Sequence, residues 1–174
     1  MIDVESWNWT DEEAADLADQ GGEELFTALL ERMIRGAPVS VAIGHLEAAA
    51  DALGRALSIE RPPVPRPYAQ LAEALALLGL YEHQRNPEAH IRGFYEGAVK
   101  ALGEATARYD SAVNWQPDLR HDVHASVAAL ALLCRDVDRA RHEVKEAARF
   151  LSAGSVLGEL AQAVERGVAS LDAR

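Results

Sequence analysis

The sequence predicts an all-α protein built from helical hairpins that recur every 49 residues. Aromatic residues make up only 6% of the chain and alanine is abundant, which favours closely packed helices over a β-sandwich. When the chain is shifted by 49 residues against itself, residues 42–56 align with residues 91–105, and Gly44 coincides with Gly93. A glycine inside a helix costs up to about 1 kcal/mol relative to alanine. Shared glycines therefore indicate a repeat and not merely a shared composition.

A capping helix is expected before the repeats, starting just after Thr10. Threonine as N-cap followed three residues later by Glu13 forms a capping box, and the acidic first turn suits the positive end of the helix dipole. Gly21 and Gly22 are expected to interrupt or bend this helix. The first repeat unit then begins at residue 23.

Each repeat unit is expected to contain a first helix, a short turn and a second helix. In the second unit, Asn86 is a good N-cap and Pro87 a good first helical residue. After the third unit, an amphipathic helix is well placed to cap the array. The single domain 1–174 therefore divides into units 23–68, 69–118 and 119–154 and a C-terminal capping helix at 155–172. The expected first helices are 23–35, 69–84 and 119–134, and the second helices are 39–57, 88–108 and 138–152.

Equivalent positions of the repeat predict equivalent packing. Leu53, Leu102 and Leu151 share one repeat position and are all expected to be buried. Ala49 and Ala98 share another and are expected at helix crossings, where small side chains let helices approach closely. The pattern is compatible with a solenoid-like array and with a compact helical bundle.

The charge of the chain narrows the choice of partner. The formal net charge is −11, from 28 acidic and 17 basic residues, so the surface repels phosphate backbones and anionic lipid headgroups. Nucleic acid is therefore a poor candidate ligand and no membrane association is expected. The single cysteine, Cys134, is expected in the core and allows no internal disulfide, and the start of the chain lacks a secretory pattern, so a cytoplasmic location is expected.

The second helices carry small residues on either side of a bulky one. Ala140, Val144 and Ala147 show this spacing in the third unit. The first unit offers Ala42, Leu46 and Ala49, and the second unit offers Tyr95 and Ala98 in its second helix together with Leu78 and Gly79 in its first helix. Over residues 23 to 154 this pattern resembles tetratricopeptide repeats.

This resemblance implies a non-catalytic protein–protein interaction or scaffold module without a cofactor. The groove of that family is lined by the first helix of each hairpin. On this chain the corresponding groove residues are Glu24, Thr27, Glu31, Glu73, Leu80, His83, Gln84 and Asp122. Their acidic character would suit a basic or neutral peptide.

Two alternative functions stay open. The segment from Arg85 to His90 resembles the Arg-x4-His motif of HEPN ribonucleases. The resemblance implies a homodimer in which Arg85 stabilises charge on the phosphorus and His90 transfers a proton. The repeat explains the same segment as an inter-helix turn, which we favour. The other alternative is an antitoxin-type or immunity-type protein whose negative charge neutralises a basic partner.

His121 and His124 form the remaining candidate site. Their spacing places both imidazoles on one helix face next to Asp122, as a metal site requires. Since no third and fourth ligand lie nearby in the sequence, protonatable surface histidines are the favoured interpretation. We therefore expect no metal and no catalytic residue.

Overall fold

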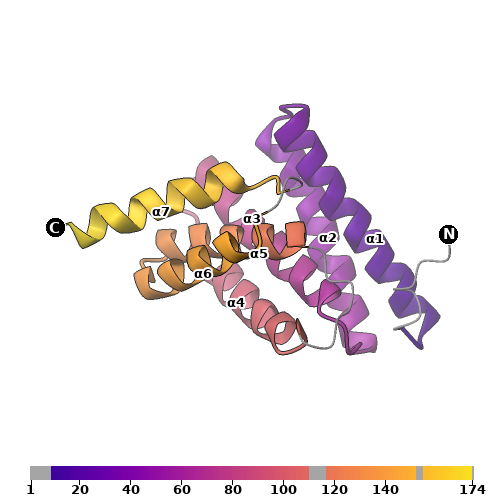
Figure 1. Cartoon of the computed structure of the whole chain (residues 1–174). Helices are drawn as coiled ribbons and strands as arrows, with labels where there is room; N and C mark the ends of the chain where they lie inside the picture. Colours follow the sequence, from indigo (N-terminus) through magenta and orange to yellow (C-terminus); the bar gives the residue numbers. More distant parts are fainter. Residues whose placement is uncertain (1–8, 110–116, 152–154, 174) are drawn as a thin grey trace.

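Helices are the only regular elements in the part of the chain that the computed structural model describes, residues 9–109, 117–151 and 155–173 (Figure 1). The predicted all-α class is confirmed. The elements are α1 (Glu12–Leu29), the single π-turn η2 (Leu30–Ile34), α2 (Val39–Ile59), α3 (Arg66–Arg85), α4 (Arg92–Thr106), α5 (Pro117–Leu133), α6 (Val137–Arg149) and α7 (Gly158–Asp172). Within these residues no helix has both the length and the apolar character needed to cross a bilayer.

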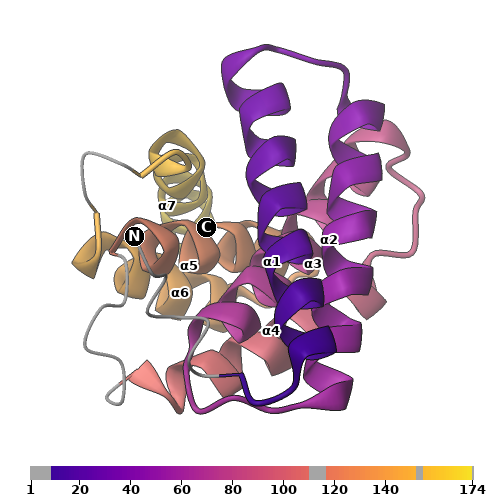
Figure 2. The ribbon, with the colours of Figure 1, turned by 90° about the vertical axis from the view of Figure 1, so that its right-hand side faces the viewer.

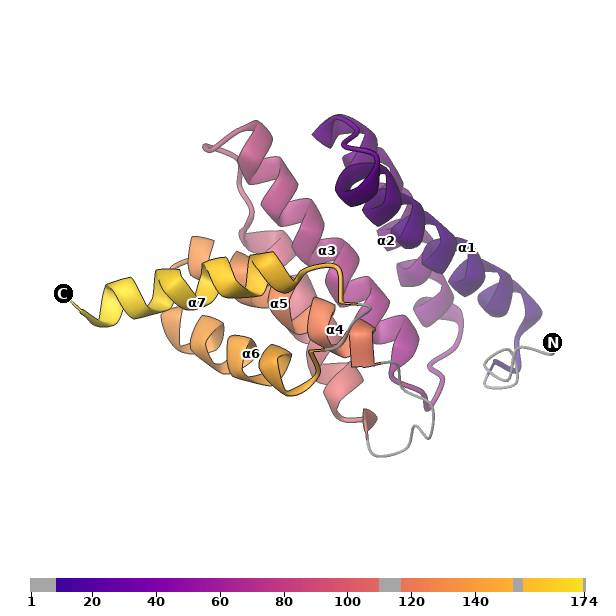
Figure 3. The ribbon, with the colours of Figure 1, turned by 45° about the horizontal axis from the view of Figure 1, so that its top comes forward.

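Consecutive helices pair into three hairpins, α1–α2, α3–α4 and α5–α6, and α7 packs along α5 and α6 (Figure 2). Neighbouring hairpins do not stack in the same way. Helix α3 packs mainly against α2 of the preceding hairpin, whereas α5 packs mainly against α3. The hairpins therefore form a compact bundle and not a regular solenoid, with α1 and α7 at opposite ends (Figure 3).

Helix α1 is longer than the sequence pattern indicated. It passes through Gly21 and Gly22 without a break, so the predicted interruption was wrong. A Cβ atom at Gly21 would lie 2.5 Å from Cγ of Leu53, and one at Gly22 would lie 3.2 Å from the side-chain nitrogen of Gln70. These glycines let α1 approach α2 and α3 closely. Their role is packing between helices and not a change in the path of the backbone.

The N-terminal end of α1 is capped by Asp11 and not by Thr10. The Asp11 carboxylate accepts a hydrogen bond from the amide of Ala14, at 3.0 Å. Thr10 instead donates its hydroxyl and its amide to Glu60, at the end of α2. The hydrogen bond from the Asp11 amide is the largest cause that lowers the pKa of Glu60. Glu60 thus fastens the two ends of the first hairpin together.

The connection between α3 and α4 also differs from the prediction. Asn86 ends α3, and its side-chain oxygen accepts a hydrogen bond from the amide of Glu88 at 3.1 Å. This local turn continues beyond Pro87, so α4 begins only at Arg92. Neither Asn86 nor Pro87 starts the second helix, because the asparagine side chain caps a turn instead.

The leucine at the shared repeat position is buried in two of the three hairpins. Leu53 and Leu102 are buried, as are Ala49 and Ala98, whereas Leu151 is 63% exposed. Helix α6 ends at Arg149, so Leu151 lies beyond the helix that would have directed it into the core. The prediction for Leu151 was wrong.

Candidate functional site

The histidines of α5 are buried and do not lie on the surface. His121 is 2% exposed and His124 is 1% exposed. Helix α5 contacts α3, α4, α6 and α7, and residues 121–131 are all buried. The surface interpretation of these histidines was wrong, because four other helices pack against α5 and cover both side chains.

Both ring nitrogens of His124 are engaged. Its Nδ1 lies 2.6 Å from Oε2 of Glu143, and its Nε2 lies 3.0 Å from the hydroxyl of Tyr109. The other oxygen of Glu143 accepts a hydrogen bond from Arg139 at 3.0 Å. Burial alone would raise the pKa of Glu143, but the hydrogen bond and charge of His124, together with Arg139, hold it below its usual value. With both nitrogens occupied, His124 has no lone pair to offer a metal ion.

Tyr109, His124 and Glu143 have the hydroxyl–imidazole–carboxylate order of a nucleophilic triad. In a nucleophilic site the hydroxyl is activated by the neighbouring base or by a lowered pKa. Burial instead raises the pKa of Tyr109 well above its usual value. The Arg120 guanidinium also lies 4.1 Å from the centre of the Tyr109 ring and covers it. The hydrogen bond between His124 and Glu143 fastens α5 to α6.

The second buried pair, His121 and Asp122, connects α5 to the start of α7. Nδ1 of His121 lies 2.7 Å from Oδ1 of Asp122. The same carboxylate accepts hydrogen bonds from the amides of Val156 and Leu157, both at 3.1 Å. Asp122 thus satisfies backbone donors at the N-terminal end of α7, where a negative charge is favourable.

Glu73 of α3 is a buried carboxyl group of a different kind. It is 1% exposed, and its Oε1 atom has no hydrogen-bond partner within the described structure. Burial, followed by the negative charge of Asp122, raises the pKa of Glu73 well above its usual value. Among the residues that the structure describes, no three histidine, cysteine, aspartate or glutamate side chains form a group that could hold a metal ion.

The predicted groove residues do not form one accessible surface. Glu73 and Asp122 are buried and cannot contact a partner, so their assignment to a groove is corrected. Oε2 of Glu24 lies 2.6 Å from Nδ1 of His45. The hydroxyl of Thr27 donates a hydrogen bond to the backbone carbonyl of Glu23 in the same helix. The rest are half-buried or exposed: Glu31, Leu80, His83 and Gln84. Their role in binding stays a prediction.

Arg85 and His90 are both exposed around the turn between α3 and α4. Arg85 is the last residue of α3 and donates to Glu82 of the same helix, at 2.7 Å. A contact within one helix therefore occupies this guanidinium. The ribonuclease hypothesis for the pair stays a prediction.

Exposed apolar side chains gather where α1 passes into η2. Phe26 is 66% exposed, Met33 47% and Ile34 72%, and Leu30 is half-buried. We call these four residues the apolar tip. The π-turn beside them is closed by a hydrogen bond from the amide of Arg35 to the carbonyl of Leu30, at 3.1 Å. Single π-turns within helices are frequent at functional sites.

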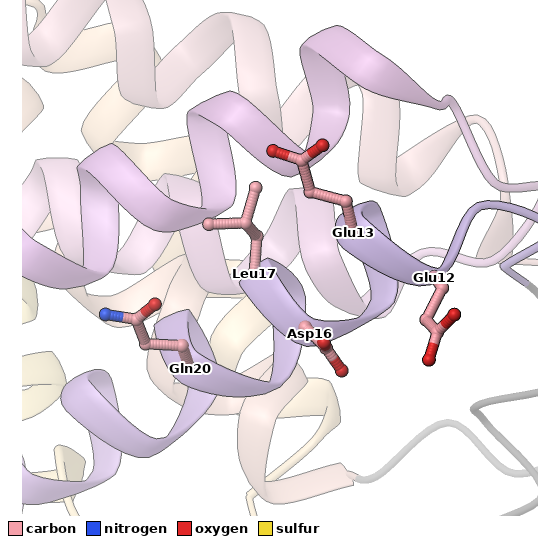
Figure 4. Close-up of a pocket in the computed structure, with 5 residues that line it drawn as sticks. All are labelled: Glu12, Glu13, Asp16, Leu17 and Gln20. Atoms are coloured by element: carbon pink, nitrogen blue, oxygen red, sulfur yellow. The ribbon is translucent and has the colours of Figure 1, made fainter.

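The N-terminal half of α1 presents acidic side chains on its outer side. Glu12, Asp16, Asp19 and Glu23 are all exposed, and we call them the acidic stripe. Figure 4 shows the shallow hollow at the start of α1, which is lined by Glu12, Glu13, Asp16, Leu17 and Gln20. Glu12 and Asp16 point to the side of the helix opposite Glu13 and Leu17 (Figure 4).

Neither the apolar tip nor the acidic stripe was predicted from the sequence. A signal was present, because Phe26, Leu30 and Ile34 recur every four residues beside the core-facing residues of α1. Comparison of the chain with family models, with curated proteins and with solved structures found no match.

Proposed function

We propose that the chain is a non-catalytic protein-binding module whose contact surface is the outer side of α1 and η2. The observation that carries the proposal is the apolar tip. Single exposed apolar residues are ordinary on protein surfaces. The apolar tip is different, because its four apolar residues lie on one helical segment and three of them are at least 47% exposed. Such a cluster is typical of an interaction site.

The polar groups of the bundle support binding over catalysis. His124, Glu143 and Asp122 are all buried. The hydrogen bond between His124 and Glu143 joins α5 to α6, and Asp122 accepts a hydrogen bond from Leu157 at the start of α7, so these polar groups hold the helices together. The predicted groove residues Glu24 and Thr27 lie on α1 as well. Helix α1 is therefore still the contact element, and its exposed side is the contact surface.

Site-specific crosslinking in the native cytosol tests the proposal. A photo-reactive phenylalanine analogue is placed at Phe26 or at Ile34, with a control at Leu151, which is similarly exposed on another part of the surface. We expect one partner protein to be crosslinked from both tip positions and not from the control. The double variant F26S/I34S should lose this partner in affinity capture, whereas L151S should retain it. Equal crosslinking from all three positions would contradict the proposal.

A further inference from the structure

The exposed side of α1 and η2 is organised in two chemical blocks along a single line. Its residues follow one another at alternating intervals of four and three, which places them in one seam along a helix. The seam consists of Glu12, Asp16, Asp19, Glu23, Phe26 and Leu30, and it continues to Ile34 because the wider π-turn brings this residue in line with Leu30. Its first part is the acidic stripe and its second part belongs to the apolar tip.

The seam lies away from the bundle. The residues that α1 buries, including Ala14, Leu17, Ala18 and Leu25, occupy a different side of the helix. All four acids are exposed. Within the described part of the chain, no cation forms an ion pair with Glu12, Asp16 or Glu23. The charges of Glu12, Asp16 and Glu23 and the apolar tip are thus available to a partner.

We propose that this seam binds one helix of a partner protein, with basic residues opposite the acidic stripe and apolar residues opposite the apolar tip. The inference rests on the proposed function and specifies its partner. Alternating intervals of four and three are the spacing into which the side chains of another helix fit. From Glu12 to Ile34 the seam is about 30 Å long at roughly 1.5 Å per residue, enough for about six turns of a partner helix.

A second copy of this chain does not fit the seam. In a parallel pair the acidic stripe of one copy would face the acidic stripe of the other, and like charges repel. In an antiparallel pair the acids would face the apolar tip and lose their hydration without gaining a partner. Nucleic acid and anionic membranes are disfavoured by the same acids. A basic amphipathic helix satisfies both blocks at once.

The test uses a synthetic helical peptide of about 22 residues. Lysines occupy one block of its seam and leucines the other, and both block orders are made because the helix can run in either direction. One control peptide has glutamate in place of lysine, and another has the same residues shuffled out of the alternating spacing. We expect one block order to bind at least about tenfold more tightly than both controls, since only it matches charge and apolar surface together.

Matched variants of the protein locate the binding. F26S/I34S should weaken binding of the block peptide by about tenfold or more, because a few buried apolar contacts carry most of the binding energy. D16N/E23Q should also weaken binding and should reduce its dependence on salt. The controls L151S and E88Q/E165Q make the same chemical changes at exposed positions elsewhere and should bind as the wild type does. Circular dichroism confirms that each variant is folded.

Two results would overturn the inference. One is equal affinity for the block peptide and the shuffled peptide. The other is a D16N/E23Q variant that behaves like E88Q/E165Q. If crosslinks from positions 26 and 34 persist while the block peptide fails, the helical partner is refuted alone. If those crosslinks fail as well, the proposed function is refuted with it.

Discussion

Glu73 offers a direct measure of what a buried carboxyl group costs this fold. The side chain lies inside the bundle on α3, and its Oε1 atom has no hydrogen-bond partner in the described structure. The perturbation is Glu73→Met, which replaces the carboxyl group with an apolar side chain of similar length. A buried polar atom without a partner costs about 1–3 kcal/mol. We therefore expect the variant to be more stable than the wild type at pH 7 by about that amount.

The pH dependence of this gain has a definite sign. Because burial and the charge of Asp122 raise the pKa of Glu73 in the folded state, the folded protein holds its proton at pH values where the unfolded chain has lost it. The wild type is then favoured at low pH and loses free energy of unfolding as the pH rises above the unfolded pKa, with a slope of up to about 1.4 kcal/mol per pH unit. The advantage of Glu73→Met should therefore be smaller at pH 4 than at pH 7.

Urea unfolding between pH 4 and pH 8 measures both effects. The difference between wild type and variant cancels the titration of the other groups. Glu73→Gln separates the charge from the polar atom, because it keeps a polar side chain that cannot ionise. The exposed residue change Glu88→Gln serves as a control for the loss of one acidic side chain. A Glu73→Met variant that is less stable than the wild type at pH 7, or a difference that shrinks as the pH rises, would refute this reasoning.

Three further predictions concern other parts of the molecule. Leu102→Ala should lower the free energy of unfolding by about 2–5 kcal/mol because it opens a cavity in the core, whereas Leu151→Ala should change it by less than about 0.5 kcal/mol in the same urea titration. Glu143→Ala should cost about 3–5 kcal/mol at pH 7 because it leaves buried groups unpaired. Since the pKa of Glu143 is lowered in the folded state, its contribution exists above the unfolded pKa, and unfolding at decreasing pH should show the cost diminish as Glu143 becomes protonated. Arg85→Ala and His90→Ala should leave the stability unchanged within about 0.5 kcal/mol. The wild type should leave labelled RNA intact, and cleavage that either variant abolishes would favour the ribonuclease hypothesis.

Sequence periodicity predicted the helical hairpins well where each helix has one buried face. The second helix of the first hairpin was expected at 39–57 and spans Val39–Ile59, and the first helix of the second hairpin was expected at 69–84 and spans Arg66–Arg85. Apolar residues at helical spacing directly predict helices that bury one face. Local hydrogen bonds are harder to predict, because the Asn86 side chain can cap either a helix or a turn and formed the turn.

Contacts between distant helices lay beyond what the pattern could show. A glycine such as Gly21 is typical of a helix break. Only the position of Leu53 against it shows that Gly21 lets α1 and α2 pack closely. His121 and His124 have the polarity of surface residues, and only the helices around α5 show that they are buried. The partners Glu143 and Val156 lie 19 residues beyond His124 and 34 beyond Asp122 in the chain. No local motif joins them.

The hydrogen bonds from Val156 and Leu157 to Asp122 make the integrity of α5 depend on residues that the ribosome adds much later. A product that stops before residue 156 has neither donor. It also lacks α7, so the side of α5 that α7 covers is open to water. Such a product opens more often and is exposed to proteolysis, because degradation follows the population of open forms. The contacts of α5 with the residues after 155 therefore link survival of the chain to completion of its synthesis past this point.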